Sequence, residues 1–264
     1  MRDDTGSTPT LDVSDVDAIV QMVARGCDPS AEPLAANRKL RLLQDLGSAV
    51  SADRWYWGTV VVTENPFQVA PVSLVDGGWA SDEERTGFIG VLADPRLNAT
   101  QQHVMTTAVG PATRTDDGEV LCPRHDWPLF WSRMADAGIA HILMSVSPAG
   151  SRMVSAVGMY RLMGRPRFSD RDRLVMHTVL RHVSALHRDS EHVSAQRRVF
   201  GLSPREREVL AHLIGGRSRN DIAEQLKLSP HTVGDYIKTI YRHFSVSDRA
   251  QLLAQFIAGS DEPA

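Results

Sequence analysis

The chain has 264 residues, a length that suggests about two domains. Hydrophobic residues make up 42% and charged residues 23%, which excludes a disordered or fibrous protein. The net charge of -3 excludes a chain-wide electrostatic attraction to nucleic acid, so any DNA binding must rest on a local basic surface.

The two cysteines, Cys27 and Cys122, are too few for a disulfide framework. The first residues are polar and acidic, and no apolar signal region follows them. No segment approaches the roughly 20 apolar residues that a membrane helix needs. These features predict a cytoplasmic protein that does not associate with membranes.

The first part of the chain, residues 13–168, combines helix and strand patterns and follows an expected disordered tail over 1–12. Apolar residues at helical spacing predict helices over 13–25, 38–50, 82–93, 100–109 and 126–137. Runs of β-branched and aromatic residues predict strands over 55–63, 69–75, 141–147 and 153–160. Turn residues at 148–151 separate the last two strands, which predicts a hairpin. We therefore expect an α+β domain built on an antiparallel sheet.

A long helix over residues 169–198 is expected to connect this domain to the rest of the chain. Ser169 and Asp172 form a capping box at its start. Apolar residues follow at heptad a and d spacing, namely Met176, Val179, Val183, Leu186 and Val193. The pattern leaves two interpretations open: the helix packs on its own sheet, or its second half pairs with another subunit.

The C-terminal part, residues 199–258, carries the signals of four short helices and precedes a tail over 259–264. The predicted N-caps are Ser203, Ser218, Ser229 and Ser247. The second and third helices are joined by the short turn Lys227-Leu228, and the small Ala223 lies where they cross. Two short helices with a tight turn between them are typical of a helix-turn-helix, in which the second helix reads the major groove of DNA.

Residues 202–253 resemble the DNA-binding domain of the LuxR family of regulators over nearly their whole length. The residues that carry the resemblance are Leu202, Ser203, Pro204, Arg205, Glu206, Ile222, Ala223, Leu226, Ser229, Thr232, Val233, Ile237, Ile240, Tyr241, Val246 and Arg249. The resemblance implies an all-α four-helix domain, with the helix from Pro230 to about His243 in the major groove.

The groove-facing helix departs from the family pattern in its middle. Gly234 stands where a lysine is common, and Asp235 and Tyr236 follow it, where a histidine is frequent at the second position. The family's usual base preference therefore cannot be transferred to this chain. The predicted DNA contacts are Lys227, Ser229, His231, Thr232, Asp235, Tyr236, Lys238, Thr239 and Arg242.

A weak basic surplus suggests that this domain binds DNA as a homodimer. Residues 197–258 contain ten Lys or Arg against six Asp or Glu, a surplus of four, which gives little non-specific affinity to a single domain. Two domains on two half-sites would bind more tightly. The resemblance implies that the last helix can pair subunits, so Leu252, Leu253 and Phe256 are candidate dimer contacts.

The N-terminal domain loosely resembles GAF-like sensor domains, mainly over residues 161–188. The resemblance implies an α/β fold that binds a small-molecule effector. A phosphorylated receiver domain is not indicated, because the acidic pair and the later aspartate that it needs are missing. An acyl-homoserine-lactone sensor remains an alternative: the aromatic run Trp55 to Trp57 suits it, although the wider pattern of those sensors does not align.

Catalysis has little support in the sequence. Cys122, His125 and Asp126 lie close together, but in a proline-containing loop pattern that favours a surface segment. Histidines recur every five residues at 177, 182, 187 and 192, so successive rings on a helix would point about 140° apart. They cannot share one metal ion, and we predict neither a metal nor a cofactor.

The sequence therefore predicts a one-component transcriptional regulator that is not an enzyme. Its N-terminal domain would sense an unknown signal, and its partner would be double-stranded DNA. One alternative is a DNA-binding regulator whose N-terminal domain only dimerises or binds a protein. Another is an enzyme fused to a DNA-binding module, for which no convincing set of catalytic groups is found.

Overall fold

The computed structural model describes residues 10–30, 32, 34–64, 67–92, 94–97, 112–115, 124, 127–150, 153–188, 199 and 201–256. An antiparallel sheet of five strands forms the centre of the N-terminal domain, in the order β2-β1-β5-β4-β3. The strands are β1 (Arg54–Glu64), β2 (Phe67–Gly77), β3 (Ala112–Thr115), β4 (Ile139–Gly150) and β5 (Met153–Leu162). Four of them match the predicted strands, and the β4–β5 hairpin is confirmed.

The short strand β3 was not predicted. It has four residues and pairs with β4, for example Ala112 with Val146, so its partners are distant in sequence.

The helix predicted over 100–109 lies outside the described residues. Among the described residues, no helix is long and apolar enough to cross a membrane.

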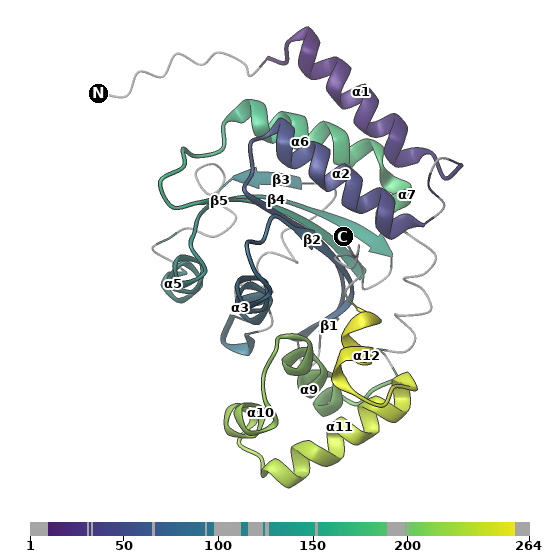
Figure 1. Ribbon diagram of the computed structural model, residues 1–264, viewed down its shortest axis with the longest axis vertical. Coiled ribbons are helices and arrows are strands. Elements are labelled where there is room, and N and C mark those ends of the chain that lie inside the picture. Colours follow the sequence, from purple (N-terminus) through teal and green to yellow (C-terminus); the bar gives the residue numbers. More distant parts are fainter. Residues whose placement is uncertain are drawn as a thin grey trace.

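Helices cover both faces of the sheet, and the alternation of strand residues separates two cores (Figure 1). Trp57 belongs to the core under α1 (Val13–Cys27), α2 (Ala35–Ala49), α6 (Asp170–His182) and α7 (Ser184–His187). Its neighbour Tyr56 belongs to the core on the opposite face, with α3 (Asp82–Leu92), the 3-10 turn η1 (Pro95–Leu97) and α5 (Pro128–Asp136). This period of two is what a sheet buried on both faces requires.

The predicted continuous helix over 169–198 is wrong in its middle. The capping box of Ser169 and Asp172 is confirmed, but α6 ends at His182 and the short α7 follows after Val183. Residues 189–198, including Val193, lie outside the described residues. The predicted a and d residues up to Leu186 are buried in the core with the sheet, α1 and α2, so this part packs on its own domain.

A buried arginine fastens the sheet to the start of α6. Arg161 on β5 donates hydrogen bonds to the carbonyl oxygens of Val50, Ser51, Pro166 and Arg167. It also binds the buried carboxylate of Asp172 at 3.1 Å. Because the guanidinium is saturated with acceptors, its charge is tolerated inside the protein.

A second buried polar chain links β1, β5 and α7. The indole N–H of Trp57 donates to Ser155 Oγ at 2.8 Å, and the Ser155 hydroxyl lies 2.8 Å from His187 Nδ1. His187 Nε2 must be the protonated nitrogen, because it lies 3.0 Å from the Leu180 carbonyl oxygen, which can only accept. Nδ1 therefore accepts from Ser155, and burial lowers the pKa of His187 to about 4.

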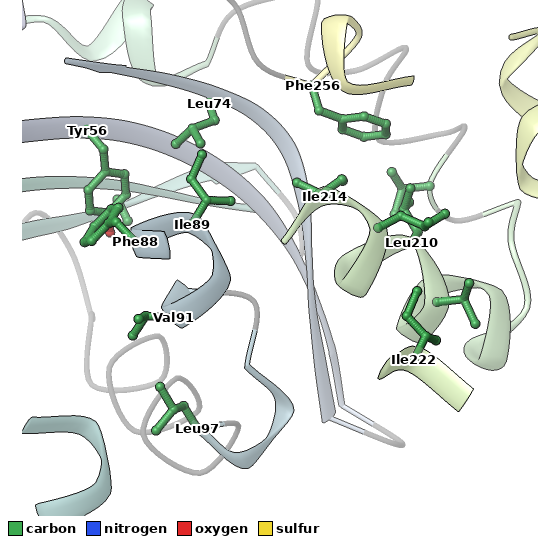
Figure 2. Packing of buried hydrophobic residues seen from close by; sticks show 14 of the residues in the cluster. Tyr56, Leu74, Phe88, Ile89, Val91, Leu97, Leu210, Ile214, Ile222 and Phe256 are labelled. Carbon is green, nitrogen blue, oxygen red and sulfur yellow. The ribbon is translucent and has the colours of Figure 1, made fainter. Parts of the chain in front are cut away.

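The C-terminal helices lie against one end of the sheet (Figure 1). They are α9 (Pro204–Ile214), α10 (Arg219–Leu226), α11 (Pro230–Phe244) and α12 (Arg249–Ala254). Their core is continuous with the core on the Tyr56 face of the sheet. Figure 2 shows Phe256 beside Ile214 and Leu210, with Leu74 on the adjacent strand. The two halves of the chain are therefore docked through apolar side chains.

Candidate nucleic-acid interface

Local capping bonds position the C-terminal helices. Capping boxes open α9 at Ser203 and α10 at Ser218, as predicted. Ser229 Oγ accepts a hydrogen bond of 3.0 Å from the backbone N–H of Thr232 and so caps α11. The fourth cap was predicted wrongly: Asp248, not Ser247, accepts from Gln251 N–H at the start of α12. A carboxylate suits this position because it interacts well with the helix dipole.

The turn between α10 and α11 is tight and depends on Lys227. This residue adopts the left-handed conformation, with φ 54 and ψ 45, directly after α10. The N–H of Leu228 donates to the Ala223 carbonyl oxygen at 2.9 Å, which closes the last turn of α10. The geometry of a helix-turn-helix follows, and the Lys227 side chain is exposed at the turn, beside the start of α11.

The buried stripe of α11 consists of Val233, Ile240 and Phe244. Ile237 was expected to be fully buried with Val233, but it is only half-buried at the edge of the core. Val233 and Ile240 are seven residues apart and point in nearly the same direction, so they define the centre of the stripe. Ile237 points about 40° away from Val233 and about 60° away from Ile240. The predicted orientation of the helix is otherwise confirmed.

The opposite face of α11 presents four exposed polar residues on one line: His231, Asp235, Lys238 and Arg242. They are spaced by four, three and four residues, so they share one face of the helix. Asp235 lies in the middle, 3.3 Å from Lys238 Nζ and 3.3 Å from His231 Nδ1. Thr232, Tyr236 and Thr239 are half-buried along the flanks of this line, and Ser229 is exposed at its start.

One basic residue beside this face was missed by the sequence reasoning. Arg219, the first residue of α10, lies over α11 at Gly234: a Cβ built on Gly234 would be 3.7 Å from Arg219 Cδ and 3.8 Å from its Nη1. The signal was available in the sequence, because a glycine inside a helix often leaves room for a neighbour. Arg219 thus places a positive charge near the position where the family often has a lysine.

Not every basic residue of the domain is available to DNA. Arg249 donates to the carbonyl oxygens of Leu213 and Arg217, which ties α12 to the end of α9. Arg207 donates to the Leu202 carbonyl oxygen, and burial lowers its pKa. Arg205 is paired with Glu208 on α9. The positive charge at the α11 face therefore comes from a smaller group, namely Arg219, Lys227, Lys238 and Arg242.

The candidate dimer contacts on α12 are placed differently from the expectation. Leu252 and Phe256 are buried within the chain, in the core shared by the two domains. Phe256 packs edge-on against Phe244, with 5.2 Å between the ring centroids. Both side chains are therefore unavailable to a second subunit in this structure, because they are buried in the core of their own chain. Leu253 is half-buried.

The docked domains enclose a cleft of about 730 Å³ between α3, the end of α5 and the junction of α9 with α10. Glycines allow the approach: a Cβ on Gly90 would be 3.3 Å from the Gly215 carbonyl oxygen, and one on Gly216 would be 2.8 Å from Thr86 Cγ2. Charged side chains from both domains line the cleft, among them Glu83, Arg133, Arg217 and Asp221. Both domains therefore contribute to the lining of this cleft, which is partly charged and partly apolar.

The other sequence candidates do not form a site in the described residues. Cys122, His125, Asp126 and His192 lie outside them. The three described histidines of α6 and α7 have different environments: His177 lies near Thr113, His182 near the Thr178 carbonyl oxygen, and His187 in the buried chain with Ser155. The three rings therefore have different hydrogen-bonding partners.

Comparison with known proteins identifies the C-terminal part of the chain. Residues 201–255 match the model of the family described as bacterial regulatory proteins, luxR family. A probable HTH-type transcriptional regulator, GfsR of Streptomyces halstedii, is 36% identical over 58 residues, which cover 22% of this chain. The matched region spans about a quarter of that relative, 24% of its length.

Solved structures similar to the whole chain show low identities. SdiA in complex with octanoyl-rac-glycerol is 16% identical with a TM-score of 0.43, and the alignment covers 93% of this chain and 96% of that chain. Escherichia coli SdiA in another crystal is 14% identical with a TM-score of 0.44, over 91% and 95% of the two chains. The N-acylhomoserine lactone-dependent LuxR family transcription factor CepR2 of Burkholderia cenocepacia is 12% identical with a TM-score of 0.44, over 66% and 95%.

The family match and the geometry of the helices agree. The matched residues, 201–255, contain α9 to α12 and the whole exposed face of α11. The C-terminal domain of this chain is therefore a helix-turn-helix domain of the LuxR family of bacterial regulatory proteins.

Proposed function

We propose that the chain is a DNA-binding transcriptional regulator in which residues 199–258 bind DNA and residues 13–168 sense a signal. Residues 169–198 connect the two parts. The observation that carries the proposal is the exposed line of polar residues on α11 within a domain of the LuxR family. In Figure 1, α11 lies at the end of the molecule far from the sheet, so the sheet does not cover this face.

The chemistry of the line suits the major groove of DNA. Lys238 and Arg242 carry donors that suit guanine O6 and N7 or phosphate oxygens, and Asp235 can accept from the amino group of cytosine. Ser229 and Thr232 lie at the N-terminus of α11, where hydroxyls and backbone N–H groups suit a phosphate. Lys227, His231, Tyr236 and Thr239 complete the proposed contact surface, with Arg219 beside it.

The contact between Asp235 and Lys238 adds a selective element. In the free protein Asp235 neutralises part of the positive charge on this face, at 3.3 Å from Lys238 Nζ. A phosphate approaching the helix would be repelled by the carboxylate, whereas a cytosine amino group would be accepted. The acid therefore lowers non-specific affinity and favours particular base pairs.

A small-molecule effector is the proposed signal, and the cleft between the domains is a suitable place for it. A molecule in the cleft would contact α3 and α5 of the sensor and the α9–α10 junction of the DNA-binding domain. It would thereby change the free energy of docking, which is what coupling between two domains requires. We keep a GAF-like sensor domain as the proposed class of the N-terminal fold.

A second candidate is a regulator whose N-terminal domain only dimerises or binds a protein partner. It is favoured by the packing of the sheet face beneath α3, where described aromatic side chains fill the space. Tyr56 and Tyr160 stack with centroids 5.9 Å apart, and Phe88 packs edge-on against Tyr160 at 5.0 Å. Mass spectrometry of small molecules released from the purified protein separates the candidates, because only a sensor binds a specific compound.

We further propose that the protein acts on DNA as a homodimer, since the small basic surface of one domain gives modest affinity. Selection of bound duplexes from a random pool tests the DNA-binding function. The expected result is enrichment of a motif with two related half-sites. Enrichment of no sequence, together with no retention of duplex DNA at low salt, would contradict DNA binding.

A further inference from the structure

His212 on α9 is a buried histidine that makes no hydrogen bond with its ring. The residue is only 1% exposed. Neither Nδ1 nor Nε2 has a hydrogen-bond partner within the described part of the chain. The other fully buried ring, that of His187, differs in that Ser155 and the Leu180 carbonyl oxygen occupy both of its nitrogens. An unsatisfied polar group in the interior is unfavourable, and an apolar side chain would fill the same place without that cost.

The side of α9 that carries His212 faces the N-terminal domain. Gly215 and Gly216 follow three and four residues later, so they lie on the same side as His212. Both glycines touch α3, as the close approaches to Gly90 and Thr86 show. Asp94, two residues beyond the end of α3, is near enough for its charge to act on the His212 ring. His212 is therefore buried at the contact between the two domains.

Burial keeps the His212 ring uncharged at neutral pH. Removal from water lowers the pKa of the ring, and the positive charge of Arg217 lowers it further. The carboxylates of Asp94 and Glu208 act in the opposite direction, but they raise the pKa by less than burial lowers it. The pKa of His212 in the docked arrangement therefore lies below the ordinary value of 6.5.

The two carboxylates near His212 already have cationic partners. Asp94 Oδ2 lies 2.5 Å from Arg96 Nη2, and Glu208 is paired with Arg205. The other charged groups on this side of α9 are those that line the cleft between the domains, namely Glu83, Glu84, Arg133, Asp136 and Asp221. A proton on the ring would therefore be a buried positive charge without a counter-ion of its own.

We propose that His212 is the acid-sensitive element of the domain contact, and that protonation of its ring shifts the chain towards an arrangement in which α9 has separated from α3 and β2. In the docked arrangement a protonated ring would be buried without a hydrogen-bond acceptor. In the separated arrangement the ring is in water and binds a proton as an ordinary histidine does. The docked arrangement binds fewer protons, so acid favours separation.

The pH range follows from the difference between the two arrangements. The pKa of His212 is below 6.5 when the domains are docked and returns to about 6.5 when the ring is solvated. The docking is therefore most stable above pH 6.5 and becomes weaker as the pH falls below that value. Between pH 7.5 and pH 5.5 the docking equilibrium should weaken by up to about ten-fold. His187 remains buried in the N-terminal core in both arrangements and does not affect this equilibrium. The inference goes beyond the proposed function, because it requires neither DNA nor an effector.

The backbone amide of Leu74 reports the docking, because its N–H donates to the Phe256 carbonyl oxygen across the domain contact. Hydrogen exchange of the full chain, followed by NMR and corrected for the intrinsic effect of pH, gives the protection factor of this amide. In the wild type the protection of Leu74 should fall by up to about ten-fold from pH 7.5 to pH 5.5. The amide of Val75, which points towards β1 because N–H directions alternate along a strand, should be more strongly protected at each pH. Equal protection of both amides at pH 5.5 would mean that exchange requires unfolding, and would overturn the proposal.

Replacement of His212 by an apolar residue isolates its contribution. His212→Leu should dock at least as firmly as the wild type at pH 7.5, since it removes two unsatisfied nitrogens, and the protection of Leu74 should stay constant down to pH 5.5. His212→Met should give the same result with a side chain of different shape. The control is His182→Gln, which removes an exposed histidine from α6 and should show the fall seen in the wild type. Constant protection of Leu74 in the wild type, or an equal fall in the wild type and both apolar variants, would overturn the proposal.

Discussion

The backbone N–H of Leu74 donates a hydrogen bond of 2.6 Å to the carbonyl oxygen of Phe256, which joins edge strand β2 to the end of α12. An edge strand exposes unpaired backbone groups, and here the DNA-binding domain satisfies one of them. The side chain of Phe256 is buried at the same place. One residue thus supplies both a polar and an apolar part of the domain contact.

Phe256→Ala should therefore loosen the docking as well as the packing of the C-terminal domain. Removal of a buried phenylalanine side chain costs about 3–5 kcal/mol. We expect a lower free energy of unfolding in denaturant and faster proteolysis between the domains. Leu129→Ala, at an exposed position of α5, is the control and should change stability little. A loss as small as that of the control would show that the domains are not docked through Phe256.

Gly234→Ala should stabilise the protein by about 0.5–1 kcal/mol, because alanine is the better residue inside a helix. The new Cβ would meet Arg219 at an ordinary contact distance of 3.7 Å. The same change at Gly158 should strongly destabilise the protein, because its Cβ would lie within 2.8 Å of Tyr56 and Tyr160 atoms. Thermal melts of the two variants should shift in opposite directions; shifts in the same direction would mean that one of the two environments is misassigned.

Ile240→Ala and Ile237→Ala remove the same side-chain atoms from α11, but the two positions differ in how deeply they are buried. Ile240 is fully buried, so its replacement should cost about 2–5 kcal/mol. Ile237 is half-buried and should cost clearly less. Denaturant unfolding of both variants measures the difference, and an equal or reversed order would indicate that α11 is rotated relative to the domain core.

Protonation of His187 should destabilise the protein in mild acid. Burial keeps the folded-state pKa near 4, below the usual 6.5. The stability is therefore complete above pH 6.5 and is lost as the pH falls towards 4, by at most roughly 3 kcal/mol. In the His187→Gln variant this part of the acid sensitivity should be absent, whereas the exposed His182→Gln should behave like the wild type. Identical losses of stability in all three proteins between neutral pH and the folded-state pKa would refute the assignment.

Sequence reasoning was most successful where structure depends on near neighbours. The caps at Ser203, Ser218 and Ser229 bind groups three residues away, so the helix starts and the helix-turn-helix could be read directly. The wrong cap at Ser247 missed its neighbour Asp248 by one residue, because both types of side chain cap helices well.

The errors concern contacts between distant segments. Leu252 and Phe256 were predicted as partner contacts because the sequence does not show that both are buried within the chain. Phe256 contacts β2 through Leu74, which lies about 180 residues earlier in the chain. The break at Val183 and the strand β3 likewise depend on packing against remote elements. The exposure of Val13, Val16 and Val20 on α1 could not be inferred either, because a helical pattern of apolar residues does not reveal which of two stripes faces the core.

The central claim, that the exposed face of α11 binds DNA, is tested most directly by a titration of Lys238→Ala against a duplex selected by the wild type. We expect Lys238→Ala to bind this duplex about ten-fold more weakly than the wild type, with unchanged thermal stability. If Lys238 contacts a phosphate, the slope of log K against log salt concentration should become about one unit less negative. The control is Arg181→Ala, which removes one exposed positive charge from α6 and should bind like the wild type. Equal affinity of Lys238→Ala and Arg181→Ala for this duplex would contradict the claim.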